Sequence, residues 1–438
     1  MMTADNRPMV TAAGPAARLA QPAGMSVDCL PTPAEQMADP VLYLTHRVPF
    51  PPDKGDRIRN YHVLRQMAAR GRVWLGCLAD EPVTAVAANE LGRLCERVAF
   101  VPVNRLSRWL RAGVSLLRGR SVSEGAFAEP GLTRVIQGWA AEQRFQAAVV
   151  SASSMVPYLK IPALTGVASV VDLVDVDSQK WLDFAAVSRS APKRWLYRVE
   201  ASRVRKLERG LPGWVRGVAV VSRAEADVFD AFAGAGTATI AANGVDLDYF
   251  RPDPEPNPAP QTCVFVGALD YLPNVDAAVW FAREVWPAIR ERCPSAEFRI
   301  VGRQPASEVV RLADLPGVRL VGQVSDVRLH VTSAAVVVVP LRLARGIQNK
   351  VLEALAMGKP VIATPPALAA LRTETGRHLL AASTPAEWVE VLCDLFADPA
   401  RCQELGAAGR RFVEENHHWE RCLNPLLETI FAPVAGRE

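Results

Sequence analysis

Residues 345–360, RGIQNKVLEALAMGKP, are well suited to binding an anionic ligand. They follow an apolar run, AAVVVVPL, that is typical of a buried strand, and Gly346 predicts a tight turn with exposed amides. A helix is expected to begin near Ile347, and its first amides have no partners within the helix. Arg345 and Lys350 add positive charge beside those amides. We therefore expect a diphosphate to bind at this turn.

The same helix carries a carboxylate one turn further on. Glu353 lies four residues after Asn349, so both side chains share one helix face. A carboxylate at this place can accept hydrogen bonds from both hydroxyls of a ribose. The alternative is a solvated glutamate on an amphipathic helix.

The elements that must position these residues form two parallel α/β units. Strand-like runs alternate with helical segments from Val41 onward, and their Val- and Ala-rich composition suits sheets buried on both faces. The sequence predicts two Rossmann-like doubly wound parallel-sheet domains that face a cleft. The expected divisions are a disordered tail (1–39), a first domain (40–242), a Pro-rich linker (243–261), a second domain (262–415) and a C-terminal segment that packs back on the first domain (416–438).

Composition excludes several classes of protein. The 438 residues carry a net charge of +4, which is far from the charge of a nucleic-acid-binding chain. No two of the eight cysteines have CxxC spacing, which argues against a zinc site or a disulfide framework and favours a reducing cytoplasm. No apolar run reaches the roughly 20 residues that span a bilayer. The uncharged stretch from Leu329 to Leu341 is expected to be a buried strand.

Loops after strands are the other expected ligand-binding segments, because ligands bind at the carboxyl ends of parallel strands. In the second domain the candidates are Gly267, Asn274, Gly302, Arg303 and Gln323, and the alternative for each is a structural turn. In the first domain Lys54, Gly55, Asp56 and Arg57 can bring amides and a cation toward an acceptor or phosphate, unless they form only a flexible surface loop. Asp172, Asp175 and Asp177 end another strand, and Asp177 can instead cap a helix.

Three motifs carry a resemblance to a known family. The segment 345–360 resembles the donor-binding stretch of glycosyltransferase family 4, in which two glutamates spaced E-x7-E precede Ala-x-Gly-x-Pro-Val-Ile. Glu353 matches the second glutamate, whereas Arg345 stands in place of the first. NGVD at 243–246, followed by Tyr249 and Phe250, resembles the linker signature of that family. LYLTHRVPFPPDKGDRIRNYHVL, VVDLVDVDSQKW and GIQNKVLEA are similar to the sugar transferases associated with exosortase (PEP-CTERM) systems.

This resemblance implies a retaining hexosyltransferase of GT-B architecture, with an acceptor-side first domain and a nucleotide-sugar-binding second domain. It would act on a glycan or lipid-linked acceptor in exopolysaccharide or cell-envelope glycan biosynthesis. The family's first glutamate commonly contacts the transferred sugar, so Arg345 leaves the donor sugar open. The family's Arg and Lys near Gly267 are absent, so Arg345 and Lys350 are expected to supply that charge. Asp175, and next Asp177, lies where the family often places a histidine against the sugar.

The expected reaction needs no cofactor and no metal. Arg345, Lys350 and the helix amides would stabilise the leaving diphosphate, and no DxD motif follows a strand of the second domain. Two basic segments, 104–121 and 193–209, are expected either to contact an anionic membrane surface on the cytoplasmic side or to be solvated helix faces.

Three other classes of protein are alternatives to this interpretation. An oxidoreductase would need a G-x-G-x-x-G turn after a first strand, and neither domain has one. A sugar-nucleotide epimerase would share the architecture, but its acids and histidines cannot be placed. A catalytically silent GT-B subunit that binds nucleotide or scaffolds a polysaccharide machine stays open because of Arg345.

Overall fold

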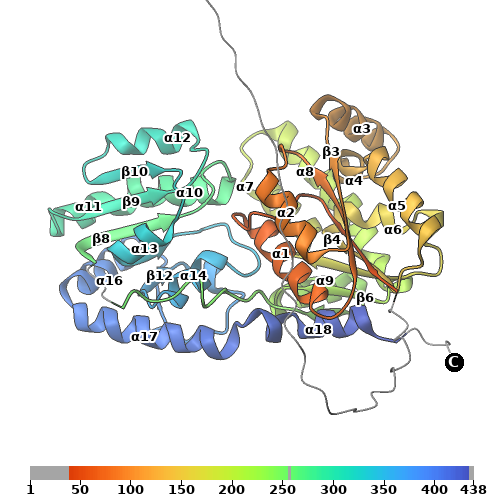
Figure 1. The fold of residues 1–438 in the computed structure, drawn as a ribbon. Helices are drawn as coiled ribbons and strands as arrows, with labels where there is room; N and C mark the ends of the chain where they lie inside the picture. The colour runs from red at the N-terminus through yellow and green to blue at the C-terminus, as the bar shows by residue number, and fades with distance from the viewer. Residues whose placement is uncertain (1–38, 255–257, 434–438) are drawn as a thin grey trace, which may run out of the picture. The chain divides into compact units, whose positions relative to one another are not determined.

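A computed structural model describes residues 39–254 and 258–433. The expected disordered tail therefore lies outside the described residues except for Asp39. Two parallel sheets contain all the described strands, and each has helices on both faces (Figure 1). We call the unit built on the first sheet the first lobe and that built on the second sheet the second lobe.

The first sheet has the strand order β3-β2-β1-β4-β5-β6-β7, and every pair is parallel. Its strands are β1 (Val41–Thr45), β2 (Val73–Ala79), β3 (Arg97–Pro102), β4 (Ala147–Ser151), β5 (Ala168–Val174), β6 (Gly217–Val220) and β7 (Ala238–Ile240). Successive residues of β1 alternate between two apolar clusters, one on each face of the sheet. That burial on both faces is why the strands are continuously apolar.

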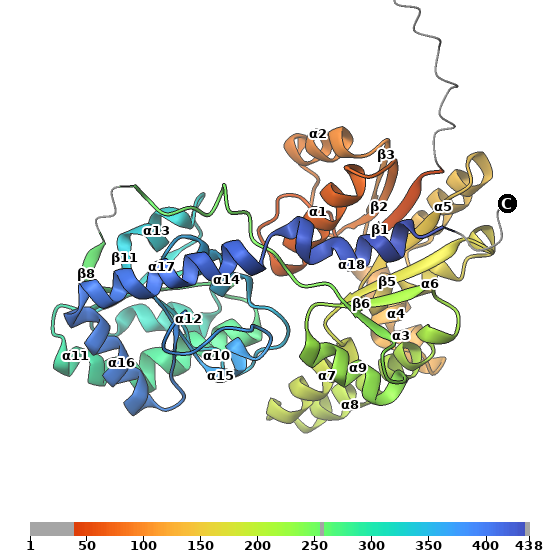
Figure 2. The same ribbon diagram turned by 90° about the horizontal axis from the view of Figure 1, so that it is seen from below.

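Helices connect these strands. They are α1 (Gly55–Ala68), α2 (Ala85–Leu94), α3 (Arg105–Leu117), α4 (Val122–Phe127), α5 (Pro130–Glu142), α6 (Val156–Leu159), α7 (Asp177–Val187), α8 (Ala191–Arg209) and α9 (Arg223–Ala233). The last helix, α18 (Trp419–Phe431), also packs on the first lobe, beside α1 (Figure 2). Trp419 stacks there on His62 of α1 with ring centroids 4.3 Å apart.

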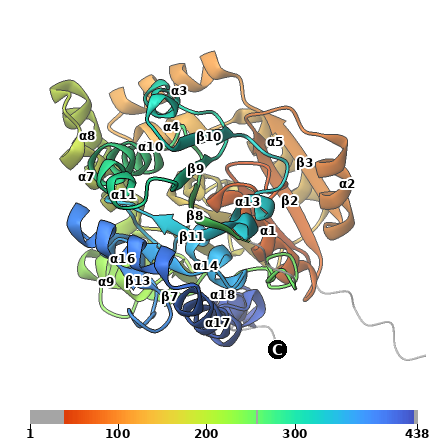
Figure 3. The same ribbon diagram turned by 90° about the vertical axis from the view of Figure 1, so that its left-hand side faces the viewer.

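The second sheet has the order β10-β9-β8-β11-β12-β13 and is also parallel. Its strands are β8 (Ala259–Val266), β9 (Glu297–Val301), β10 (Val318–Gly322), β11 (Ala334–Val339), β12 (Val361–Ala363) and β13 (Leu380–Ala381). Its helices are α10 (Leu272–Trp280), α11 (Trp286–Arg292), α12 (Ser307–Val310), α13 (Arg328–Ser333), α14 (Asn349–Ala356), α15 (Pro365–Leu368), α16 (Pro385–Ala397) and α17 (Pro399–Asn416). Helix α14 lies beside α17, as Figure 3 shows.

The structure confirms the prediction of two doubly wound parallel-sheet units. One strand prediction was wrong: Leu329–Leu341 is not a single strand, because α13 occupies its first residues and Leu329 is 70% exposed. Within this uncharged run no Gly or Pro precedes Pro340, so nothing distinguishes the helix end from the strand start. Within the described residues, no helix is long and apolar enough to cross a bilayer.

Candidate functional site

The order of the second sheet reverses between β8 and β11, and ligands of doubly wound sheets bind where the strand order reverses. Gly267 directly follows β8, and the loop 340–348 follows β11. The backbone is tightly packed here, since a Cβ on Gly302 would lie 1.7 Å from the Gly267 carbonyl oxygen. Gly302 therefore has to be glycine for the ends of β8 and β9 to meet.

The turn before α14 leaves its amides without partners. Gly346 has φ of 59°, the left-handed conformation that glycine adopts without strain. Among the described residues, none accepts a hydrogen bond from the backbone amides of 346–350. One expectation needs correction: α14 begins at Asn349 rather than near Ile347, because Gln348 is still extended. Gly346 itself is buried.

Lys350 brings its ammonium group to the end of β8. Its Nζ donates to Asn274 Oδ1 at 2.6 Å and lies 4.7 Å from the centroid of the Phe265 ring. A Cβ on Gly267 would lie 3.0 Å from the same nitrogen. Burial lowers the pKa of Lys350 to about 7, although Glu353 acts in the opposite direction. The ammonium group thus lies beside the loop that follows β8, next to Gly267 and Asn274.

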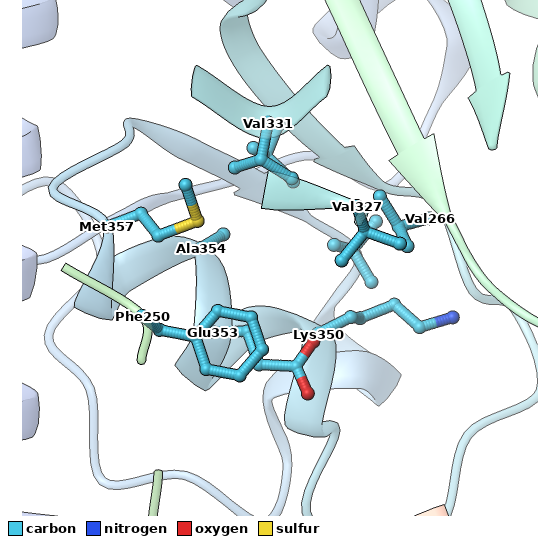
Figure 4. A pocket seen from close by; sticks show the side chains of 10 residues that line it. Phe250, Val266, Val327, Val331, Lys350, Glu353, Ala354 and Met357 are labelled. Carbon is cyan, nitrogen blue, oxygen red and sulfur yellow. The ribbon is translucent and has the colours of Figure 1, made fainter. Parts of the chain in front are cut away.

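Glu353 lines a small hollow whose volume is about 10 Å³, which is room for roughly one water molecule. Its walls are mostly apolar and include Phe250, Val266 and Met357 (Figure 4). Burial raises the pKa of Glu353 to about 7, although Lys350 lowers it. No described residue forms a hydrogen bond with its carboxylate. Glu353 is therefore half-buried at an apolar hollow rather than on a fully exposed helix face.

Arg345 does not present an unpaired cation, contrary to the expectation that it would supply charge for a diphosphate. Its guanidinium donates to Asp183 Oδ2 at 3.0 Å and to Glu225 Oε1 at 2.8 Å, and both acids belong to the first lobe. Glu225 is buried and its other oxygen accepts from the amide of Val176 at 2.8 Å. Two carboxylates thus compensate the charge of Arg345 in this arrangement.

Asp175 of the first lobe lies against the turn of the second lobe. A Cβ on Gly346 would lie 2.0 Å from Asp175 Oδ1, and that oxygen is buried without a hydrogen-bond partner in the described structure. The preceding residue, Val174, has φ of 67°, which is a strained conformation for a β-branched side chain. Such strain persists where the surrounding structure imposes it, commonly at functional sites.

Burial, followed by the charge of Glu225, raises the pKa of Asp175 from 3.8 to about 6, and Lys180, Asp177 and Arg345 modify it further. A raised carboxyl pKa means that the folded state binds the extra proton, so stability falls as pH rises from about 4 to about 6. We predict that Asp175→Asn removes this loss and is about 2 kcal/mol more stable than the wild type above pH 7.

Urea unfolding of both proteins at pH 4 and pH 8 measures the effect as a difference. A variant less stable than the wild type at pH 8 would show that the ionised carboxylate stabilises this site.

The acceptor-side candidates of the first lobe lie in a network of ion pairs. Asp56 accepts from His46 and Arg47, each at 3.1 Å; burial alone would raise its pKa, but these two partners bring the pKa below its ordinary value. Arg57 donates to Asp53 and Glu81. The Lys54 ammonium lies 3.8 Å from a Glu81 oxygen, and Gly55 opens α1 with open space beside its Cα.

Asp177 accepts from Ser153 Oγ at 2.5 Å rather than capping α7 with its side chain.

The remaining candidates, Arg303, Gln323 and Asn349, do not line the hollow beside Glu353. Arg303 follows β9 and donates to Asp53 of the first lobe at 2.9 Å. Gln323 follows β10 and is exposed. Asn349 is the first residue of α14, and its Oδ1 accepts from Asn243 of the linker at 2.9 Å.

Sequence reasoning missed a buried network behind the site. Arg59 and Asp172 are both fully buried and form two hydrogen bonds, of 2.8 and 2.9 Å. Arg59 also donates to Asn243 Oδ1 at 2.8 Å, and Asn243 in turn donates to Asn349. The first lobe thereby holds the residue that opens α14. The linker motif NGVD marked Asn243, but nothing in the sequence marked its partner Arg59.

Within residues 39–254 and 258–433, no group of three or more His, Cys, Asp or Glu side chains is placed to hold a metal ion. Metal independence stays a prediction.

Comparisons with known proteins bear on the fold and on the second lobe. Residues 260–398 match the model of a family described as glycosyl transferases group 1. No curated protein matches the chain. Sucrose-phosphate synthase from Thermosynechococcus elongatus is 16% identical, with a TM-score of 0.68 over 90% of this chain and 100% of that one.

Two further solved structures are similar over 90% of this chain and 100% of theirs. HepE from Anabaena, in complex with UDP and glucose, is 13% identical with a TM-score of 0.65. WaaG, a glycosyltransferase involved in lipopolysaccharide biosynthesis, is 16% identical with a TM-score of 0.63. The fold is therefore GT-B. Together with the family match in the second lobe, it supports a GT-B glycosyltransferase.

Proposed function

We propose that this protein is a retaining glycosyltransferase that moves a hexosyl residue from a nucleotide sugar to a glycan or lipid-linked acceptor. One observation carries the proposal: the unpartnered amides of 346–350, the ammonium of Lys350 and the carboxylate of Glu353 gather where the strand order of the second sheet reverses. Amides and a cation bind a diphosphate, and a nearby carboxylate binds a ribose.

The donor class is supported by one similar structure. HepE is described in complex with UDP and glucose, which are the parts of a nucleotide sugar. The hollow beside Glu353 holds roughly one water molecule, so donor binding requires the side chains around it to move apart. Asp175 also lies against Gly346, and we propose that it withdraws when the diphosphate binds.

In the proposed reaction the leaving diphosphate gains charge as its bond to the sugar breaks. Lys350 and the amides of 346–350 stabilise that charge, which is the largest electrostatic contribution available in this site. Asp175, on the first-lobe side, orients the acceptor or the sugar. No metal takes part in this scheme.

The pathway and the place of action are also proposals. The motifs shared with exosortase-associated sugar transferases favour exopolysaccharide or cell-envelope glycan biosynthesis. A lipid-linked acceptor would place the protein in the cytoplasm, peripheral on the inner face of the cytoplasmic membrane.

The ribose role of Glu353 gives a direct test. Glu353→Ala is expected to keep the fold and to lose the rise in melting temperature that the cognate donor gives the wild type, because ligand stabilisation follows affinity. UDP-, GDP- and dTDP-sugars are screened by thermal shift, with Glu291→Ala, an exposed glutamate of the same lobe, as the matched control. Equal donor stabilisation of the Glu353 and Glu291 variants would remove Glu353 from the ribose site.

Transfer of a radiolabelled sugar into a lipid extract separates the enzyme from its alternatives. The proposal predicts label in the lipid fraction with the sugar unchanged. Donor binding without any transfer would favour a catalytically silent scaffold subunit. This class is the second candidate because Arg345 stands in place of the first glutamate of the family motif. Conversion of the free donor to another nucleotide sugar would favour an epimerase.

A further inference from the structure

Helix α3 carries its large apolar side chains on the outside. Their exposed fractions are 72% for Leu106, 71% for Trp109, 64% for Leu110, 45% for Val114 and 89% for Leu117. The other four follow Leu106 at three, four, eight and eleven residues, which places all five along one stripe of the helix. We call these five residues the α3 stripe; within the described structure it is exposed rather than packed into the core.

The inner side of α3 is fixed by small and polar contacts. Ala112 and Ser115 are buried, and Ser115 Oγ donates to the Ser121 carbonyl at 2.7 Å. A Cβ on Gly125 of α4 would lie 2.3 Å from Ser115 Cβ, so the two helices pack closely side by side (Figures 1 and 3). The helix is therefore held with its apolar side outward, the reverse of an ordinary surface helix.

The positive charge around the α3 stripe favours an anionic binding partner. Residues 104–121 contain five arginines and no acid. Arg105, Arg118 and Arg120 are exposed, whereas Arg111 pairs with Glu129 at 2.6 Å. A second copy of the chain would bring like charges together, but an anionic lipid surface pairs with the arginines while the apolar side chains enter the acyl boundary.

We propose that α3 is an interfacial helix that binds the protein to an anionic membrane through the α3 stripe. The second basic segment, 193–209, lies in α8 and has a structural role instead. Its Arg203 donates to the carbonyls of Leu116 and Arg120 and so supports the end of α3.

The position of α3 also bears on the acceptor, a step that rests on the proposed function. The Arg108 guanidinium lies 4.6 Å from the centroid of the Phe127 ring, and Phe127 contacts His46 edge to face at 5.7 Å. His46 in turn bonds Asp56 on the acceptor side. Two side chains thus connect the membrane-bound helix to the acceptor-side loop, which favours an acceptor that resides in the membrane.

Vesicle flotation of the full chain tests the surface without requiring transfer activity. We expect the wild type to bind vesicles of phosphatidylcholine with phosphatidylglycerol far better than phosphatidylcholine alone. The triple variant Leu106→Ser, Trp109→Ser, Leu117→Ser is expected to bind at least about tenfold more weakly. Arg118→Gln with Arg120→Gln should lose affinity only for the anionic vesicles, by about tenfold.

The matched control is Val310→Ser with Leu329→Ser, which removes exposed apolar side chains from the second lobe. It should bind vesicles like the wild type. Unchanged binding of the triple variant would overturn the proposal, as would equal binding to both kinds of vesicle. A wild-type dimer in light scattering that the triple variant abolishes would assign the stripe to self-association instead. A failed transfer assay with intact vesicle binding would overturn the proposed function alone.

Discussion

Replacing Lys350 by methionine is expected to lower kcat/KM for sugar transfer by about 100- to 1000-fold, the usual cost of removing one group that stabilises developing charge. The ammonium lies at the end of β8, held by Asn274 and buried enough to shift its pKa toward 7. Methionine keeps about the length of the side chain and removes the charge together with the hydrogen bond to Asn274. Initial rates with a radiolabelled donor measure the loss.

Lys160→Met serves as the control, because Lys160 is an exposed lysine of the first lobe that stacks on Trp214. Its kcat/KM should match the wild type. If Lys350→Met retains more than about a tenth of the wild-type value, the leaving diphosphate is stabilised by other groups.

Replacing Arg59 by methionine is expected to lower the free energy of unfolding by about 3 to 5 kcal/mol. The change leaves Asp172 fully buried without its ionic partner and removes a donor from Asn243. Urea unfolding followed by circular dichroism measures the loss.

The double variant Arg59→Met, Asp172→Leu gives the contrast. Because it removes both charges from the interior, it should regain much of the stability that the single variant loses. A single variant destabilised by less than about 1 kcal/mol would show that water reaches Asp172 and that the pair is not a buried one.

The fold was predictable because it rests on local patterns. Apolar strands such as VLYLT and AAVVVV alternate with helical segments, and a Pro-rich stretch separates two such series. A doubly wound sheet then follows from the right-handed parallel connections that strand–helix–strand units make. The prediction of a single strand from Leu329 to Leu341 was wrong because nothing in the composition of this run marks where α13 ends and β11 begins.

The second-lobe part of the candidate site was also predictable, since Gly346, Lys350 and Glu353 lie within eight residues of one another. What the sequence could not supply were contacts between distant segments. Arg345 meets Glu225, 120 residues away, and Arg59 meets Asp172, 113 residues away. Such pairs depend on how the lobes pack, and no local spacing records that packing.

The central claim is that the amides of 346–350 and Lys350 bind a diphosphate, and calorimetric titration of the wild type tests it most directly. The nucleoside diphosphate of the donor that stabilises the protein best is compared with its nucleoside. The account predicts that the diphosphate binds at least about 100-fold more tightly, because charge-assisted hydrogen bonds to the two phosphates are added. Equal affinities, or no binding of the diphosphate, would contradict it.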